Sequence, residues 1–282
     1  MQKKLLVAVL GTLFAMPVLA DDAPAAAAAP AAAPAPVVTS NVSLVTDYIF
    51  RGVSQTGTKP AIQGGFDYTP ASGFYAGVWG SNISWITDAG PTTATSANVE
   101  LDTYLGFRNS FATDYNYDVG YLRYNYPGNY ATGVTKADTD EIYGLIGWKW
   151  LTAKYSYSLG DTFGVSNAKG SSYFDLSASY PVGDSGFTLG AHYGKQTYKG
   201  STADVLKANY VAGVSQDPTY SDYKLSVTKD LASVSKDLSG YILGLAYTNT
   251  TNKSGGFNTS VAAAGSKDLG KGTAVLSISR TF

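Results

Sequence analysis

The chain has 282 residues, of which 20 are basic and 21 acidic, and its formal net charge is −1. It contains no cysteine, which excludes disulfides, and it lacks the basic patch that nucleic-acid binding requires, so no nucleic-acid partner is expected. Tyrosine (22) and glycine (31) are abundant, whereas charged residues make up only 15%. Past residue 20 no apolar run is long enough for a membrane-spanning helix, which excludes a helical membrane protein.

Residues 1–20 have the pattern of a secretory signal peptide. Lys3 and Lys4 precede an apolar run, and Val18-Leu19-Ala20 forms a small-residue cleavage site before Asp21. The alternative, a retained membrane anchor, is disfavoured because the run is too short to cross a bilayer. Loss of Lys3 and Lys4 leaves 18 basic against 21 acidic residues, a net charge of −3.

Residues 21–40 form an Ala/Pro-rich linker. Its repeated prolines remove helix donors and favour extended geometry, which predicts a semi-rigid tether. Two interpretations stay open: a disordered spacer with no partner, and a periplasmic arm that reaches toward the cell wall.

From residue 41 to the end, apolar and polar residues alternate with a period of two, which is typical of strands with two different environments. The alternation predicts twelve strands, at 42–53, 61–69, 74–84, 98–108, 115–125, 139–149, 151–160, 172–180, 187–194, 220–228, 241–249 and 273–282. The registers of the third and fifth are left open, because Tyr and Trp occur on both of their faces.

The predicted connections are segregated by length. Every second one is tight (70–73, 109–114, 149–150 and 181–186), and those between are longer (85–97, 126–138, 161–171, 195–219 and 250–272), apart from 54–60. One turn, 229–240, carries the duplication SVTKDL/SVSKDL and is interpreted as a local insertion. Long loops on one side and tight turns on the other indicate an outer-membrane barrel. The prediction is an all-β, antiparallel, up-and-down transmembrane β-barrel of twelve strands over residues 41–282, with both termini on the periplasmic side.

The alternation assigns faces. In the first strand we expect Val42, Leu44, Tyr48 and Phe50 to contact lipid, and Asp47 and Arg51 to face the lumen. Across the barrel the candidates for lining the pore are Asp47, Arg51, Asp67, Glu100, Asp102, Arg108, Glu141, Lys154, Asp175, His192, Asp222 and Lys224. Seven acids against four bases predict a weak preference for cations if the lumen is open. Alternatively these charges pair, as Asp47 and Arg51 could, and close a narrow barrel.

Aromatic residues near strand ends are expected at the headgroup level. They are Tyr48, Phe50, Phe66, Tyr68, Phe74, Tyr180, Phe187, Tyr241, Tyr247 and Phe282. The last strand ends on Phe282, which resembles the C-terminal sorting signal of bacterial outer-membrane barrels, and this implies the barrel-assembly machinery as a partner. Arg280 lies on the outward face of that strand and would have to reach the interface.

Three motifs carry a family resemblance: Asp47-Tyr48-Ile49-Phe50-Arg51-Gly52, then residues 60–65 (PAIQGG), then residues 72–79 (SGFYAGVW). With SDYKL at 221–225 and Phe282, they resemble the TorF-type porins of Gram-negative outer membranes. The resemblance spans about Asn41 to Phe282. It implies an outer-membrane barrel with a pore function, in contact with membrane lipid and lipopolysaccharide, and it supplies no substrate or catalytic residue.

A catalytic or metal site has little support. The one histidine, His192, lies on the polar face of the ninth predicted strand, with no serine two residues on. No cysteine and no His pair at ligand spacing occur, and the acids near Asp138 lack calcium-loop spacing, so no metal or cofactor is expected.

The sequence therefore predicts a non-enzymatic, porin-like channel for passive diffusion of small solutes. The alternatives are a closed barrel whose external loops bind a ligand or partner, and an outer-membrane hydrolase that uses His192.

Overall fold

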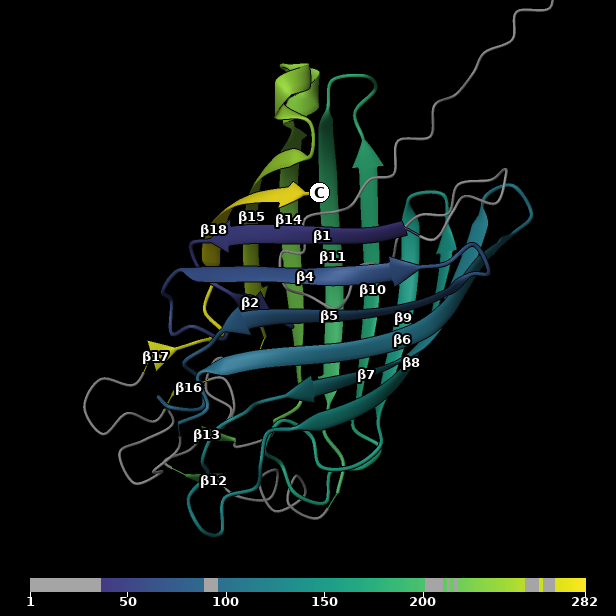
Figure 1. The fold of residues 1–282 in the computed structure, drawn as a ribbon. Helices are drawn as coiled ribbons and strands as arrows, with labels where there is room; N and C mark the ends of the chain where they lie inside the picture. The colour runs from purple at the N-terminus through teal and green to yellow at the C-terminus, as the bar shows by residue number, and fades with distance from the viewer. Residues whose placement is uncertain are drawn as a thin grey trace, which may run out of the picture.

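The computed structural model describes residues 37–88, 96–200, 210–211, 214–215, 218–251, 259–260 and 267–282. Twelve antiparallel strands form one closed barrel, in which each strand pairs with its neighbours along the chain and the first pairs with the last (Figure 1). They are β1 (Val37–Val45), β4 (Ala61–Thr69), β5 (Phe74–Asn82), β6 (Val99–Phe111), β7 (Tyr115–Asn125), β8 (Thr139–Trp148), β9 (Leu151–Ser158), β10 (Ser172–Pro181), β11 (Phe187–Thr197), β14 (Tyr220–Asp230), β15 (Tyr241–Thr250) and β18 (Thr273–Thr281). The predicted strand number and the antiparallel topology are confirmed.

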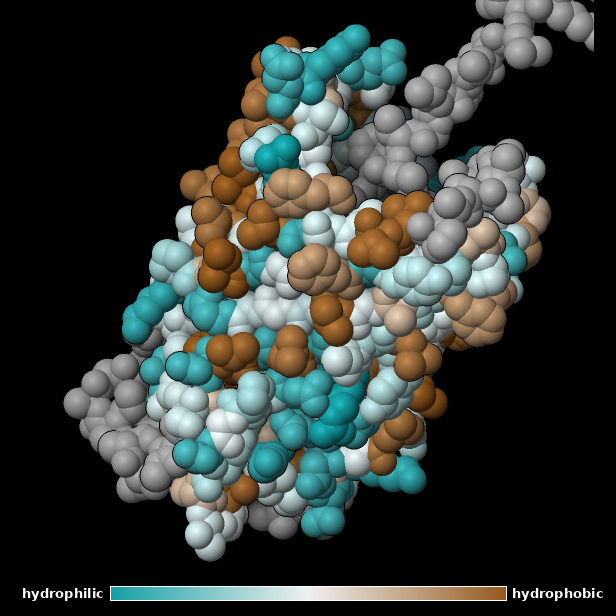
Figure 2. All heavy atoms as spheres, in the orientation of Figure 1, coloured by the Kyte–Doolittle hydropathy of each residue, from teal (hydrophilic) through white to brown (hydrophobic). Residues whose placement is uncertain are grey.

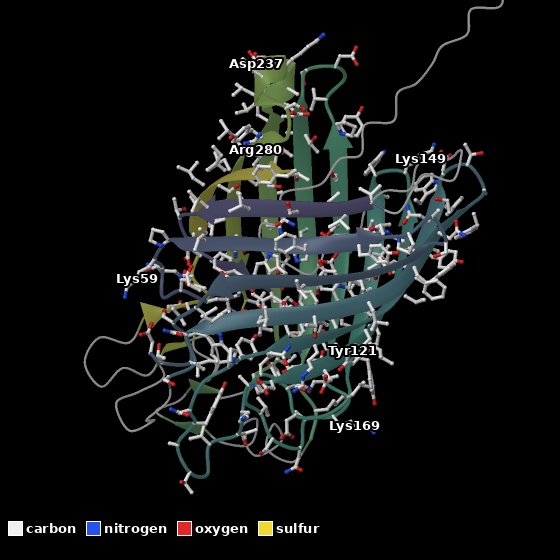
Figure 3. The ribbon with its side chains drawn as sticks, viewed as in Figure 1. Lys59, Tyr121, Lys149, Lys169, Asp237 and Arg280 are labelled. Atoms are coloured by element: carbon white, nitrogen blue, oxygen red, sulfur yellow. The ribbon has the colours of Figure 1, made fainter. Side chains whose placement is uncertain are left out.

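The two ends of the barrel differ, as the connection lengths predict. At one end, the turn end, the strands are joined by tight turns, and the insertion at 231–240 folds as two 3₁₀ helices, η1 (Leu231–Ser233) and η2 (Lys236–Leu238). The longer connections gather at the opposite end, the loop end (Figure 1). In Figure 3, Asp237, Arg280 and Lys149 mark the turn end, and Lys59 and Lys169 mark the loop end. β1 begins and β18 finishes at the turn end.

The outer face of the barrel is apolar, because alternate residues of each strand point outward and most of them are hydrophobic. Exposed aliphatic and aromatic side chains lie on every wall strand, among them Leu44, Ile62, Phe66, Val78, Leu105, Val119, Ile146, Tyr155, Leu176, Leu189, Leu225, Leu245 and Leu276. Figure 2 shows such apolar side chains over the wall, with hydrophilic ones gathered toward the loop end. In β6, β10 and β14 exposed residues such as Leu105, Leu176 and Leu225 alternate with inward ones, as the period of two predicts.

The outward position of Arg280 is confirmed as well. Its Nη1 donates to the hydroxyl of Tyr241 at 3.1 Å, and its guanidinium lies 4.7 Å from the Tyr241 ring and 4.5 Å from the Phe282 ring. The aromatic faces shield the charge where the strand ends.

The first predicted strand is wrong in its second half. The wall strand β1 ends at Val45, and residues 46–60 turn into the barrel as a hairpin of β2 (Ile49–Phe50) and β3 (Val53–Ser54). Tyr48 and Phe50 are therefore buried inside the barrel and do not contact lipid. The connection predicted to be short, 54–60, belongs to this longer segment, which we call the lumen hairpin. β1 also begins at Val37, inside the predicted linker.

The predicted signal peptide and most of the linker lie outside the described residues. Within the described ranges no helix is long and apolar enough to cross a membrane. Two further short strand pairs, β12 (Tyr210–Val211) with β13 (Val214–Ser215) and β16 (Thr259–Ser260) with β17 (Lys267–Asp268), belong to long connections at the loop end.

A charge placed on the outer face should destabilise the barrel in lipid, whereas the same charge on the inner face should not. Leu225 is outward and 66% exposed, and its neighbour Ser226 faces the lumen and is partly exposed. Leu225→Arg is expected to lower the free energy of unfolding in lipid vesicles by about 2–4 kcal/mol, and Ser226→Arg by clearly less. Urea titration followed by fluorescence measures both; equal losses would contradict the assignment of faces.

Candidate functional site

The lumen hairpin reverses direction at Arg51-Gly52. Both residues have positive φ, 47° and 76°, between the paired residues Phe50 and Val53. Two central residues with positive φ are what a two-residue type I′ hairpin turn requires, and glycine meets that need without strain. Arginine is unusual there, because a left-handed backbone is costly for a residue with a Cβ.

The base of the hairpin is held by a set of hydrogen bonds. The Asp47 carboxylate accepts from the Ser54 hydroxyl at 2.7 Å and from the Thr56 hydroxyl at 3.0 Å, which joins the two arms. The Gln55 carbonyl accepts from the backbone N–H of Ser84 (2.8 Å) and of Trp85 (3.0 Å). The hairpin is thereby fixed to the next long connection at the loop end.

The middle of the hairpin contacts the wall through Tyr48. Its hydroxyl donates to Glu100 of β6 at 3.1 Å, and its ring meets Trp79 edge-on with centroids 5.6 Å apart. Burial raises the pKa of the Tyr48 phenol well above its usual value, and the negative charge of Glu100 acts in the same direction. Burial likewise raises the pKa of Tyr126, again beside Glu100. Both phenols therefore stay neutral and can donate.

The tip of the hairpin is anchored by the Arg51 guanidinium, which is completely buried. Nη2 donates to one carboxylate oxygen of Glu141 at 2.8 Å and Nη1 to the other at 3.2 Å, a bidentate pair. Nη1 also donates to the side-chain carbonyl of Gln196 at 2.7 Å, and Nη2 to the Tyr124 hydroxyl at 3.4 Å. The charge is thus neutralised and hydrogen-bonded inside the barrel.

Aromatic rings complete the surroundings of Arg51. Its guanidinium carbon lies 4.3 Å from the ring centre of Tyr173, 4.8 Å from that of Phe50 and 5.5 Å from that of Phe163. Phe163 comes from a second small turn in the β9–β10 connection, where Thr162 and Val165 form a bridge and Phe163 and Gly164 both have positive φ. We call Glu141, Gln196, Tyr124, Tyr173 and Phe163 together the Arg51 cage.

These contacts show that the lumen hairpin crosses the barrel. In the closed strand order β9 lies opposite β1, and β8 and β10 flank β9. The hairpin leaves the wall after β1, and its tip reaches Glu141 on β8 and Tyr173 on β10. A Cβ placed on Gly52 would lie 2.5 Å from the Asp222 Cβ and 2.7 Å from the Thr250 Cγ2, so the tip also abuts β14 and β15.

His192 lies beside this tip, linked to it by Tyr173. Its Nε2 is 2.9 Å from Asp222 and 3.0 Å from the Tyr173 hydroxyl, and its Nδ1 is 2.9 Å from Asp175 and 3.0 Å from the Ser177 hydroxyl. Ser177, His192, Asp175 and Asp222 are therefore in contact. Because they come from three strands, β10, β11 and β14, no sequence spacing predicts this contact. Each ring nitrogen thus has one hydroxyl and one carboxylate oxygen within 3.0 Å, and the Ser177 hydroxyl donates to Asp175 at 2.7 Å.

The inner face holds all twelve predicted candidates. Nine are buried in the wall or hairpin, and Asp67, Arg108 and Lys224 are more exposed than the rest. Inner-face charges have close partners: Tyr104 donates to Asp67 at 2.6 Å, Arg108 donates to Thr69 at 3.3 Å, and the Lys154 ammonium lies 4.3 Å from the Tyr143 ring centre. The structure brings Asp175, His192 and Asp222 together, and Arg51 with Glu141.

Sequence reasoning missed several residues of this interior. Asp118 of β7, whose strand register was left open, faces inward and accepts from Tyr75 at 2.6 Å. Tyr124, Phe163, Tyr173 and Gln196 of the Arg51 cage were not singled out. The one local signal was Gly52 directly after Arg51, since a glycine inside a strand pattern suggests a turn or a close backbone approach.

The inner face is unequally packed along the axis. Around the lumen hairpin the wall residues are buried, whereas toward the turn end they are partly exposed and mostly carry hydroxyls or amides: Thr39, Asn41, Thr69, Thr152, Ser179, Ser226 and Thr228, with Arg108. The interior thus narrows where the hairpin crosses it.

A protein-family comparison matches residues 28–282, a range that includes every described residue, to a model described as "Bacterial protein of unknown function (Gcw_chp)". The chain belongs to the Gcw_chp family. A search among curated proteins finds no match.

Solved structures with a similar fold are distant from this Gcw_chp protein. The KdgM porin is 7% identical, with 87% of this chain and 98% of that chain covered and a TM-score of 0.44. The NanC porin is 10% identical, with 87% and 99% covered and a TM-score of 0.48. OprD from Pseudomonas aeruginosa is 12% identical, with 79% and 59% covered and a TM-score of 0.38.

Two neighbouring acids on β8 offer a matched test of the anchor. Glu141 points inward to Arg51, whereas Asp140 points outward to Arg123 at 2.8 Å in a pair whose side chains are 33% and 39% exposed. Glu141→Gln leaves a buried guanidinium without its counter-charge and is expected to lower the free energy of unfolding by about 3–5 kcal/mol. Asp140→Asn should cost about 0–1 kcal/mol. Equal losses in urea titrations of the refolded protein would contradict the anchor.

Proposed function

We propose that this protein is an outer-membrane channel for the passive diffusion of small solutes, and that the lumen hairpin sets its bore. The observation that carries the proposal is the hairpin itself: a segment of the first long connection crosses the inside of a barrel with an apolar exterior and a polar interior. A barrel that wall side chains alone could close would not need such a segment. Barrels of eight strands are filled by side chains and barrels of sixteen leave an open channel, so a twelve-stranded barrel is intermediate in width.

The pore-lining set follows from the same geometry. Along the narrowed part it comprises Asp47, Arg51, Glu100, Asp102, Glu141, Lys154, Asp175, His192 and Asp222, and toward the turn end Asp67, Arg108 and Lys224. With Asp118 added, this pore-lining set has eight carboxylates against four Arg and Lys residues. This excess supports a weak preference for cations. Reversal potentials in a salt gradient measure it, and values that favour anions would contradict it.

Export and membrane contacts complete the proposal. The predicted signal peptide directs the chain to the periplasm, and the resemblance to TorF-type porins agrees with an outer-membrane location. Lipid and lipopolysaccharide would cover the apolar belt, and Phe282, exposed at the turn end, would be read by the barrel-assembly machinery. The turn end would then face the periplasm, with the linker extending from β1 on that side.

One observation favours a second function, a closed barrel whose loop end binds a ligand. The tip of the hairpin touches β8, β10, β14 and β15 at once, which is the arrangement expected of a plug. Planar-bilayer recordings of the purified protein separate the two functions: conductance steps support the channel, and their absence in both wild type and the variant below would contradict it.

Gly52→Ala should widen the channel. The added methyl group would meet Asp222 and Thr250 at 2.5 and 2.7 Å, and φ is +76°, so the tip cannot seat as it does in the wild type. Larger single-channel conductance than the wild type is expected. Gly133→Ala is the matched control, because Gly133 also has positive φ (85°) but a methyl group added there would meet no atom within 4 Å, and its conductance should stay unchanged. An unchanged conductance for Gly52→Ala would contradict a bore set by the hairpin.

A further inference from the structure

The Arg51 cage is built almost entirely by the barrel and not by the hairpin. Glu141, Gln196, Tyr124 and Tyr173 lie on or at the ends of wall strands, and Phe163 lies in the β9–β10 connection. Among the other side chains around the guanidinium, the Phe50 ring comes from the hairpin itself. The wall therefore presents a preformed group of acceptors and rings to whatever occupies the position of the Arg51 guanidinium.

The chemistry of this group is specific for a planar, forked cation. The two Glu141 oxygens each receive a different terminal nitrogen, at 2.8 and 3.2 Å, and the Gln196 carbonyl receives a second bond from Nη1 at 2.7 Å. The Tyr173 ring covers the guanidinium at 4.3 Å. A guanidinium satisfies parallel acceptors and stacks on a ring at the same time, whereas an ammonium is a compact point charge that does neither.

We propose that the Arg51 cage is a binding site for small solutes that carry a guanidinium group, which compete with Arg51 for it. The inference rests on the proposed channel in that solutes reach the cage through the lumen. Arg51 holds its place from a left-handed backbone, φ 47°, which favours exchange because the hairpin relieves that strain when it withdraws. Other carboxylates of the inner face, Glu100, Asp102, Asp175 and Asp222, would draw cationic solutes into the lumen.

The test removes the Arg51 side chain from the cage and adds a small guanidinium compound that could bind in its place. Arg51→Asn removes the guanidinium and leaves an Asn-Gly pair, the preferred sequence for this turn, so the hairpin can still form. Melting of the folded barrel in detergent micelles is followed while methylguanidinium chloride is added. Methylammonium chloride at equal ionic strength and urea are the control solutes. We expect a saturable rise in melting temperature with methylguanidinium, with an apparent affinity about tenfold or more above that for methylammonium, the size of one charge-assisted hydrogen bond.

Two further variants identify the site. Adding Glu141→Gln to Arg51→Asn should abolish the preference for methylguanidinium. Arg108→Asn is the matched control, because Arg108 is also an inner-face arginine, lies 4.7 Å from the Tyr75 ring and is not part of the cage; it should show no guanidinium-specific shift. Equal responses to methylguanidinium and methylammonium, or a preference that survives Glu141→Gln, would overturn the proposal.

The wild-type protein gives an independent measurement should Arg51→Asn not fold. Methylguanidinium should speed hydrogen exchange of the amides of residues 49–54 more than methylammonium does, and an equal effect would overturn the proposal. Conductance of the same samples separates the two hypotheses. A preference for methylguanidinium without conductance would support the binding site and contradict the channel. Conductance without that preference would support the channel and overturn the binding site.

Discussion

The interior of this barrel depends on one bidentate ion pair, between Arg51 at the tip of the lumen hairpin and Glu141 on the wall. Both side chains are about 1% exposed, and their closest oxygen–nitrogen distance is 2.8 Å. Taking two charges out of water is expensive, and the interaction compensates only where the geometry is good and the remaining donors are satisfied. Gln196 and Tyr124 accept further hydrogen bonds from the terminal nitrogens, and aromatic rings surround the guanidinium. The path of the hairpin across the lumen follows from this pairing.

Around the anchor, the inner wall is a network of phenols and carboxylates. Tyr48 donates to Glu100, Tyr75 to Asp118 and Tyr104 to Asp67. Each bond lets a carboxylate stay in a narrow interior while the ring fills space between strands. The outer face depends less on such bonds, because most of its side chains are apolar. The alternation of each strand thus separates an apolar outer face from an inner face stabilised by hydrogen bonds.

Most of the wall could be predicted from the sequence, because a period of two and the segregation of loop lengths are strong local signals. The lumen hairpin could not. Its residues continue the alternation of β1, with Tyr48 and Phe50 on one face and Asp47 and Arg51 on the other. Alternation shows which residues share a face, but it does not show whether that face is turned toward the exterior or the interior of the barrel. The outward assignment of Tyr48 and Phe50 was wrong for this reason. The contact of Ser177 with His192 arises because β10 and β11 pair in a register that places these two residues opposite each other. The sequence alone does not give that register. Asp118 was missed where tyrosines occupy both faces of a strand.

We propose that the lumen hairpin limits the size of the solutes that pass through the barrel. Liposome swelling with neutral sugars and polyethylene glycols of graded size measures that limit directly, in the wild type and in a variant in which residues 48–56 are replaced by a short glycine-serine linker. We expect the variant to admit solutes that the wild type excludes. An identical size limit for the two proteins would contradict the claim.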